Sequence, residues 1–193
     1  MSSISLAGTG SLGLSIQEKQ LLNQLDRPKK IQDFLETIPI NYEPEGDTCL
    51  SPREVLKQRR AHCIEGAMLA ALALRVHGHR PLLLDLTSAR HDFDHVVAVF
   101  GTRGAWGAIS KTNHAVLRYR EPIYRTLHEL ALSYFHEYFD DAGRKTLRSY
   151  SDTVDLTRVD ARGWMTSEKN VWYVVDLLNA APHHDLLTRS QLM

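Results

Sequence analysis

The chain of 193 residues contains only two cysteines, Cys49 and Cys63. Two cysteines are too few for a disulfide framework or for a structural zinc site of the usual spacing. No apolar run is long enough to cross a bilayer, and the N-terminus lacks the basic flank and apolar core of a secretion signal. These absences predict a cytoplasmic protein that uses no metal or other cofactor.

An excess of charge of one sign is also lacking, because 23 Lys and Arg residues balance 23 Asp and Glu residues. A neutral chain has no global attraction for nucleic acid or anionic membranes, so we expect neither as a partner. The length suits one well-cored domain. We expect a flexible Ser- and Gly-rich segment over 1–14 and a single domain over 15–193, with its core at about 31–140.

Helix signals dominate the first half of the chain. Residues 15–18 and 51–54 have the spacing of capping boxes, and Pro28 suits the first turn of a helix that Pro39 ends. A buried helix rich in Ala and Leu is expected over 63–78, with Gly78 as its C-cap.

Strand patterns follow this helix. The apolar run at 81–86 and the β-branched run at 95–100 predict buried strands, and a turn at 101–104 leads to a third strand at 105–110. The remaining expectations are a linker at 118–123, helices at 126–139 and 167–180, a polar stretch at 143–159 with one strand near 154–159, and an exposed tail at 182–185. The fold class is therefore α+β.

Cys63 is the candidate nucleophile. It falls in the first turn of its helix, where unpaired N–H groups and the helix dipole favour a thiolate. A free cysteine is also among the most buried residue types, so a core role is the alternative for Cys63 taken alone. Thiol catalysis needs an imidazole within reach, and His95 at the start of a strand meets this requirement. His62 is expected to point elsewhere because it is adjacent to Cys63, and Glu65 is interpreted as a helix-dipole residue.

This arrangement resembles the transglutaminase-like superfamily, in its bacterial form, whose core is papain-like. The resemblance covers roughly 31–111 and rests on Tyr42, the segment 51–78, the run 81–84, and the segment 94–99 followed by Trp106. It implies an N-terminal helical half, a central helix carrying the cysteine, and a small antiparallel sheet flanked by C-terminal helices. It also implies that Cys63 attacks a carbonyl and that His95 acts as its base.

The third member of the constellation departs from the family pattern. The family usually places an aspartate four residues after the strand tryptophan, and this chain has Ser110 there. Asn113 is preferred as the residue that orients His95, because asparagine has that role in papain-like enzymes, and Ser110 is the alternative. Tyr42, His62 and Trp106 are candidates for lining the substrate cleft.

The sequence therefore predicts thiol-dependent acyl transfer or hydrolysis on an amide of a protein or peptide, as in a peptidase, deamidase or transglutaminase. Backbone N–H groups of Cys63 and of the residue before it are the expected oxyanion donors. Two alternatives stay open: an inactive fold that binds proteins or peptides, favoured by Ser110, and a redox-sensing thiol protein. The substrate, the acyl acceptor and the oligomeric state are not specified.

Overall fold

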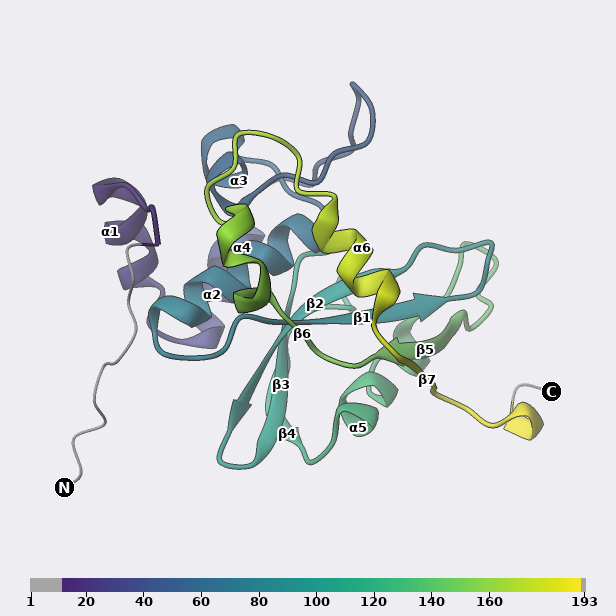
Figure 1. The fold of residues 1–193 in the computed structure, drawn as a ribbon. Coiled ribbons are helices and arrows are strands. Elements are labelled where there is room, and N and C mark those ends of the chain that lie inside the picture. The colour runs from purple at the N-terminus through teal and green to yellow at the C-terminus, as the bar shows by residue number, and fades with distance from the viewer. Residues whose placement is uncertain (1–11, 192–193) are drawn as a thin grey trace.

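A computed structural model describes residues 12–191 of the chain, which form helices packed on both sides of an antiparallel sheet (Figure 1). The α+β class predicted from the sequence is confirmed. Of the segment expected to be flexible, residues 1–11 lie outside the described range. Its last residues are packed, since Leu14 is buried and the Gly13 carbonyl accepts a hydrogen bond of 2.7 Å from Arg53 Nη2.

The sheet has the strand order β4-β3-β2-β1-β5-β7, and β6 pairs separately with β1. The two central strands form the predicted buried pair, and β2 and β3 form the predicted hairpin, in which Arg103 and Gly104 have positive φ. The strands are β1 Leu82–Ser88, β2 His95–Thr102, β3 Ala105–Ser110, β4 Arg120–Tyr124, β5 Leu147–Ser151, β6 Val154–Asp155 and β7 His183–Asp185.

Helices α1 (Ile16–Gln24), α2 (Pro28–Glu36) and α3 (Pro52–Gln58) begin where the sequence predicts. Both hydrogen bonds of the capping box are present before α1, but only one is present before α3. The Glu54 carboxylate instead accepts hydrogen bonds from Lys57 and Gln58. The second half of a capping box is therefore not obligatory when the acidic side chain has other partners.

The central helix α4 (Cys63–Val76) begins at Cys63, as predicted. It ends one residue before its C-cap, His77, so Gly78 follows the cap rather than forming it. Gly78 has a φ of +85°, and this left-handed conformation lets His79 N donate to the Leu74 carbonyl at 3.0 Å. The glycine thus turns the chain from the buried helix toward β1.

Two predicted segments have a different structure because pairing at a sheet edge does not require an apolar pattern. The segment 118–123, expected to be a linker, contributes β4, whose side chains are at least partly exposed. The tail 182–185 is exposed, as expected, but its backbone pairs with β5 as strand β7. Backbone hydrogen bonds, rather than burial of side chains, place both strands.

The remaining C-terminal helices are shorter than the sequence predicts. The expected helix 126–139 divides into α5 (Leu127–Leu132) and a 3₁₀ turn, Phe135–Glu137, and the expected helix 167–180 contains only α6 (Tyr173–Ala180). The polar stretch 143–159 holds β5 and β6 and runs into a 3₁₀ helix, Leu156–Arg162. Apolar residues before and after a turn can both face a core, so apolar spacing alone does not locate the turn.

Alternate side chains of the central strands enter two different cores. Leu83, Val96 and Ala98 pack with α1–α4 and α6 on one face, whereas Val97 and Val99 pack with α5 on the other. Figure 1 shows α1, α2 and α4 on one side of the sheet and α5 on the other. Burial on both faces explains why β1 and β2 read as continuous apolar runs.

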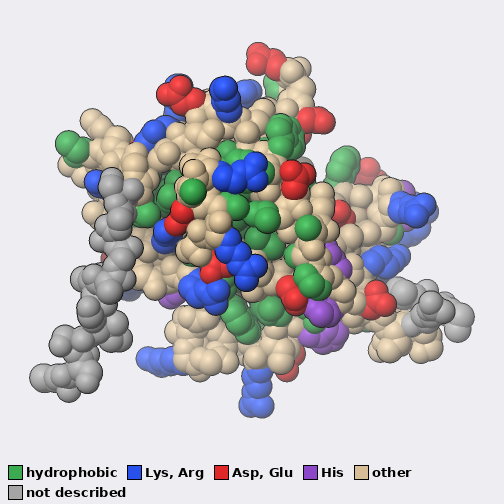
Figure 2. Space-filling view, in the orientation of Figure 1, with side chains coloured by type: hydrophobic (Ala, Val, Ile, Leu, Met, Phe, Trp, Pro, Cys, Tyr) green, Lys and Arg blue, Asp and Glu red, His purple; other side chains and the backbone are tan. Residues whose placement is uncertain are grey.

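On the face shown in Figure 2, acidic and basic side chains are interspersed, so neither sign of charge predominates there. Within residues 12–191, no helix has the length and the apolar character needed to span a bilayer.

Candidate active site

The Cys63 thiol lies in a cleft of about 550 Å³. The cleft is formed by the N-terminal end of α4, the start of β2 and three loops that precede α3, precede β2 and follow β3. A further wall comes from the segment after α5. Of the residues singled out in the sequence, this cleft brings together Tyr42, His62, Cys63, His95 and Asn113.

Trp106 does not line the cleft, so that part of the prediction is wrong. Its side chain packs with the apolar cluster between the sheet and α5, and its backbone pairs with Tyr124 of β4. Trp106 lies four residues before the end of β3, whereas the cleft opens at that end. A core position is also the commoner environment of a strand tryptophan.

Cys63 is the first residue of α4 and is partly exposed to the cleft. Burial acts to raise the pKa of its thiol, but hydrogen bonding with the His62 and His95 side chains outweighs burial and brings the pKa to about 5. The first turn of the helix favours a thiolate in the same direction. The geometry therefore holds Cys63 as a thiolate at neutral pH.

The hydrogen-bond partner of His95 shows which of its ring nitrogens carries the proton. His95 is buried, and its Nε2 atom lies 2.7 Å from Ser110 Oγ. The single hydroxyl proton of Ser110 is donated to the Leu117 carbonyl at 2.6 Å, so Oγ must accept from an Nε2–H group. Nδ1 is then the nitrogen with a lone pair that can take a proton.

Ser110, rather than the preferred Asn113, is therefore the residue that orients His95. Asn113 is exposed in the loop after β3 and makes no hydrogen bond with His95 in the described part of the chain. The register explains the difference, because Ser110 pairs with Val97, two residues along β2 from His95. A serine at this position reaches the imidazole directly from the neighbouring strand.

His62 lines the same cleft as Cys63, which agrees with its place among the cleft candidates and contradicts the expectation that it points elsewhere. As the N-cap of α4 it has an extended backbone, which directs its ring back over the start of the helix. His62 Nε2 lies 3.0 Å from the Thr48 carbonyl and 3.3 Å from Glu65 Oε1. Both partners are acceptors, so Nε2 carries a proton here as well.

Glu65 is fully buried behind His62, a role that the helix-dipole interpretation missed. Its carboxylate accepts hydrogen bonds from four donors at 2.7–3.1 Å, namely Asn41 Nδ2, Thr48 Oγ1, Leu50 N and His62 N. Burial acts to raise its pKa, but contact with His62 and these donors lowers the pKa to about 2. The sequence signal for this site was the N-cap to N3 spacing of residues 62 and 65.

Gly66 allows the first turn of α4 to approach the end of β3 closely. A Cβ atom added to Gly66 would lie 2.2 Å from Cβ of Lys111, the residue after Ser110. Lys111 is itself buried and donates through Nζ to the Ile38 carbonyl. The absence of a side chain at position 66 thus lets the helix that begins at Cys63 pack against the end of β3, next to the strand that begins at His95.

The walls of the cleft combine acidic and aromatic side chains. Three of its aromatic residues, Tyr42, Phe93 and Phe139, are exposed, and Phe93 is 88% exposed. The lining carboxylates are Glu43, Asp92, Asp94, Glu137, Asp140 and Asp141, whereas Lys111 is the lining lysine. The exposed aromatic side chains in the same cleft as Cys63 form apolar surface of the kind that marks a binding site.

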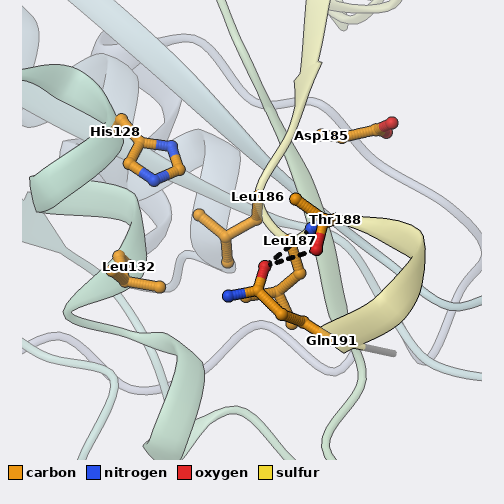
Figure 3. Close-up of a pocket in the computed structure, with 7 residues that line it drawn as sticks. All are labelled: His128, Leu132, Asp185, Leu186, Leu187, Thr188 and Gln191. Carbon is orange, nitrogen blue, oxygen red and sulfur yellow. Dashed lines mark hydrogen bonds between the residues drawn. The ribbon is translucent and has the colours of Figure 1, made fainter. Parts of the chain in front are cut away.

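A second hollow, of about 410 Å³, lies on the α5 side of the molecule (Figure 3). It is lined by His128 and Leu132 of α5, by Asp185 at the end of β7 and by residues that follow this strand. Gln191 Oε1 closes one wall by accepting from the backbone and hydroxyl of Thr188 at 2.9 Å. No cysteine lines this hollow and the Thr188 hydroxyl is bound to Gln191, so it is not the candidate active site.

Among the described residues, no group of three or more His, Cys, Asp or Glu side chains is arranged to hold a metal ion. A scan against models of known protein families found no match, and neither did a search of curated protein sequences. The function must therefore be argued from the cleft itself.

Proposed function

We propose that the protein is a thiol-dependent acyltransferase or amidohydrolase that acts on an amide of a protein or peptide. The observation that carries this proposal is the cleft that Cys63 and His95 line together, with buried Ser110 fixing the His95 proton on Nε2. Nucleophile, base and orienting group are the parts that covalent catalysis by a thiol requires.

The resemblance to the transglutaminase-like superfamily and its papain-like core is part of the proposal. The order of elements supports it, because the cysteine begins a buried helix, the histidine begins a central strand, and the orienting residue ends the next strand. Ser110 occupies the position of the family aspartate and bonds the imidazole. Unlike a carboxylate, however, a serine hydroxyl supplies no charge.

The proposed chemistry has two steps. The Cys63 thiolate attacks the amide carbonyl, a C–S bond forms, and the C–N bond breaks as the leaving nitrogen takes a proton from an imidazolium. Water or an amine then attacks the thioester while an imidazole removes its proton, and breakage of the C–S bond restores the thiolate.

The oxyanion formed during each attack requires a hydrogen-bond donor. The N–H group of His62 is already bound to Glu65 Oε2 at 3.0 Å, which corrects the expectation that it serves this purpose. The N–H group of Cys63 lies in the first turn, where no intrahelical carbonyl is available to it. We assign the oxyanion to this donor.

A peptide or protein is the substrate class that the cleft favours. The exposed rings of Tyr42, Phe93 and Phe139 give the substrate apolar surface to cover, and the lining carboxylates disfavour an acidic acyl donor. The alternative, a binding module without turnover, would use the same surface.

Acylation by p-nitrophenyl acetate separates these two functions. An enzyme should form an acetyl thioester at Cys63, detected by intact mass and peptide mapping, and release it faster when glycine ethyl ester is added as an amine acceptor. Ammonia release from glutamine-containing peptides then reports the natural class of reaction.

The matched control is Cys63→Ser, which keeps the size of the side chain. If wild type and Cys63→Ser are acylated equally, or if the thioester forms but never turns over, the enzymatic proposal is wrong. Binding of the glutamine-containing peptides without any thioester would support the binding module instead.

A further inference from the structure

Two imidazoles, rather than one, adjoin the thiol. His62 and His95 both line the cleft beside Cys63, and each has a proton fixed on Nε2 by an acceptor. In each ring Nδ1 is therefore the nitrogen that can take the thiol proton. The local charge decides which ring becomes the cation.

The partners of the two rings differ in charge. His95 Nε2 donates to the neutral hydroxyl of Ser110. His62 Nε2 lies 3.3 Å from Glu65 Oε1, a carboxylate that is fully removed from solvent. A second carboxylate oxygen, Glu43 Oε1, lies 3.6 Å from the same nitrogen. An imidazolium is stabilised by a buried carboxylate much more than by a hydroxyl, because little solvent screens the attraction.

The Glu65 carboxylate is in turn held ionised by its surroundings. Its four other hydrogen-bond donors include two backbone N–H groups, of Leu50 and His62. Hydrogen bonds to the charged form of a carboxylate favour that form. Glu65 is thus a fixed negative charge whose position is set by the fold.

The following inference rests on the proposed function. We propose that His62 holds the proton of the Cys63 thiol as a cation paired with Glu65, while His95 stays neutral and activates the acyl acceptor. His62 is a catalytic residue in this scheme because it takes up and returns the proton of the reacting sulfur. Glu65 acts through His62 and is a positioning residue.

With these roles for His62 and His95, every proton moved during one turnover is accounted for. The thiol proton passes to His62 Nδ1, and His62 gives that proton to the leaving nitrogen when the C–N bond breaks. His95 Nδ1 removes a proton from water or an amine as it attacks the thioester. Once the C–S bond breaks, this proton returns through the sulfur to His62, which restores the starting ion pair.

The pKa values agree with this geometry. Burial acts to lower the pKa of His62, but its contacts with Cys63 and Glu65 raise it to about 11, while the pKa of Cys63 is about 5. Between these values the sulfur is a thiolate and His62 is its cation.

The test is the pH dependence of alkylation of Cys63 by iodoacetamide, followed by mass spectrometry of the Cys63 peptide. This readout separates Cys63 from Cys49, which is buried. The variants are His62→Gln, Glu65→Gln and His95→Gln, and each keeps a hydrogen-bonding side chain of similar size. Far-UV circular dichroism and urea unfolding verify that each variant is folded.

We expect His62→Gln to move the midpoint of alkylation upward by about two pH units, a hundredfold change in the ionisation constant. Glu65→Gln should move the midpoint in the same direction by about one unit, an effect that a purely structural role of Glu65 would not produce. His95→Gln should move the midpoint least and instead slow the release of the acetyl thioester. If His95→Gln moves the midpoint of alkylation as far as His62→Gln does, or farther, the proposal is overturned.

A measurement on wild type keeps the proposal testable if His62→Gln does not fold. The nitrogen chemical shifts of the isotopically labelled protein report whether each ring is neutral or cationic, and sequential backbone assignment identifies the His62 and His95 signals among those of the ten histidines. A cationic His62 beside a neutral His95 at neutral pH is expected, and the reverse overturns the proposal. Failure of the proposed function is distinguishable, because it would abolish the thioester while leaving these protonation states unchanged.

Discussion

Gly66→Ala tests whether the close approach of α4 to the end of β3 assembles the site. The added Cβ would lie 2.2 Å from Lys111 Cβ and 2.7 Å from Lys111 Cγ, whereas ordinary contacts begin at 3.4 Å. Lys111 cannot turn aside, because its Cβ is attached to the backbone and its Nζ is bound to the Ile38 carbonyl. The helix and the strand must therefore separate.

Two effects of opposite sign set the magnitude. Replacing glycine with alanine inside a helix favours folding by about 1 kcal/mol. Overpacking costs typically about 1–3 kcal/mol, and a clash between two Cβ atoms lies at the upper end. We expect a net loss of about 1–2 kcal/mol, which for a chain of this size lowers the melting temperature by about 2–8 °C.

We expect Gly66→Ala to affect the rate of thioester release more strongly than the free energy of unfolding. A displacement of about 1 Å between reacting groups is enough to cost about 100-fold in rate. Urea unfolding, thermal melting and release of the acetyl thioester from Cys63 would be measured together on Gly66→Ala.

The control is a double-mutant cycle with Lys111→Gly, which removes both clashing atoms. The penalty of Gly66→Ala should shrink in that background, because the two residues are in direct contact. A Gly66→Ala protein that is as stable and as active as wild type would refute the reasoning, and so would an equal penalty in both backgrounds.

Two further predictions concern the groups behind the imidazoles. Glu65 has a pKa lowered from 4.5 to about 2, so its contribution to stability is complete above pH 4.5 and is lost as the pH falls toward 2. The depression corresponds to about 3 kcal/mol, and the stability difference between wild type and Glu65→Gln in urea should shrink over this window; a constant difference would contradict it. Ser110→Ala leaves His95 Nε2 and the Leu117 carbonyl without their shared partner, so we expect a loss of about 1–3 kcal/mol and slower thioester release. Asn113→Ala, which removes no hydrogen bond to His95, is the control for stability and should leave the free energy of unfolding unchanged.

The sequence alone predicted the parts of the fold that depend on local chemistry. The start of α4 at Cys63, the first hydrogen-bonded turn of α1 and the hairpin of β2 and β3 follow from apolar spacing, capping residues and turn residues. The positions of Cys63 and His95 at the starts of their elements follow from the same signals. These features require only neighbours along the chain.

The elements that the sequence did not predict depend on distant partners. Strands β4 and β7 carry no apolar alternation and exist because β3 and β5 offer unpaired backbone groups. The helix expected over 126–139 breaks after α5, where Tyr134 and Tyr138 both enter the core beneath the sheet. Local propensity does not contain this information.

The chemistry of the site was decided mostly by tertiary structure. Ser110 rather than Asn113 orients His95 because strand register, not residue type, sets which side chain reaches the imidazole. Glu65 looks like an ordinary first-turn carboxylate in the sequence, and only the packing of the loop before α3 buries it against His62. The sequence by itself determined which residue types were available. The fold determined which of them meet at the sulfur, because hydrogen bonds and charge act through distance in space rather than along the chain.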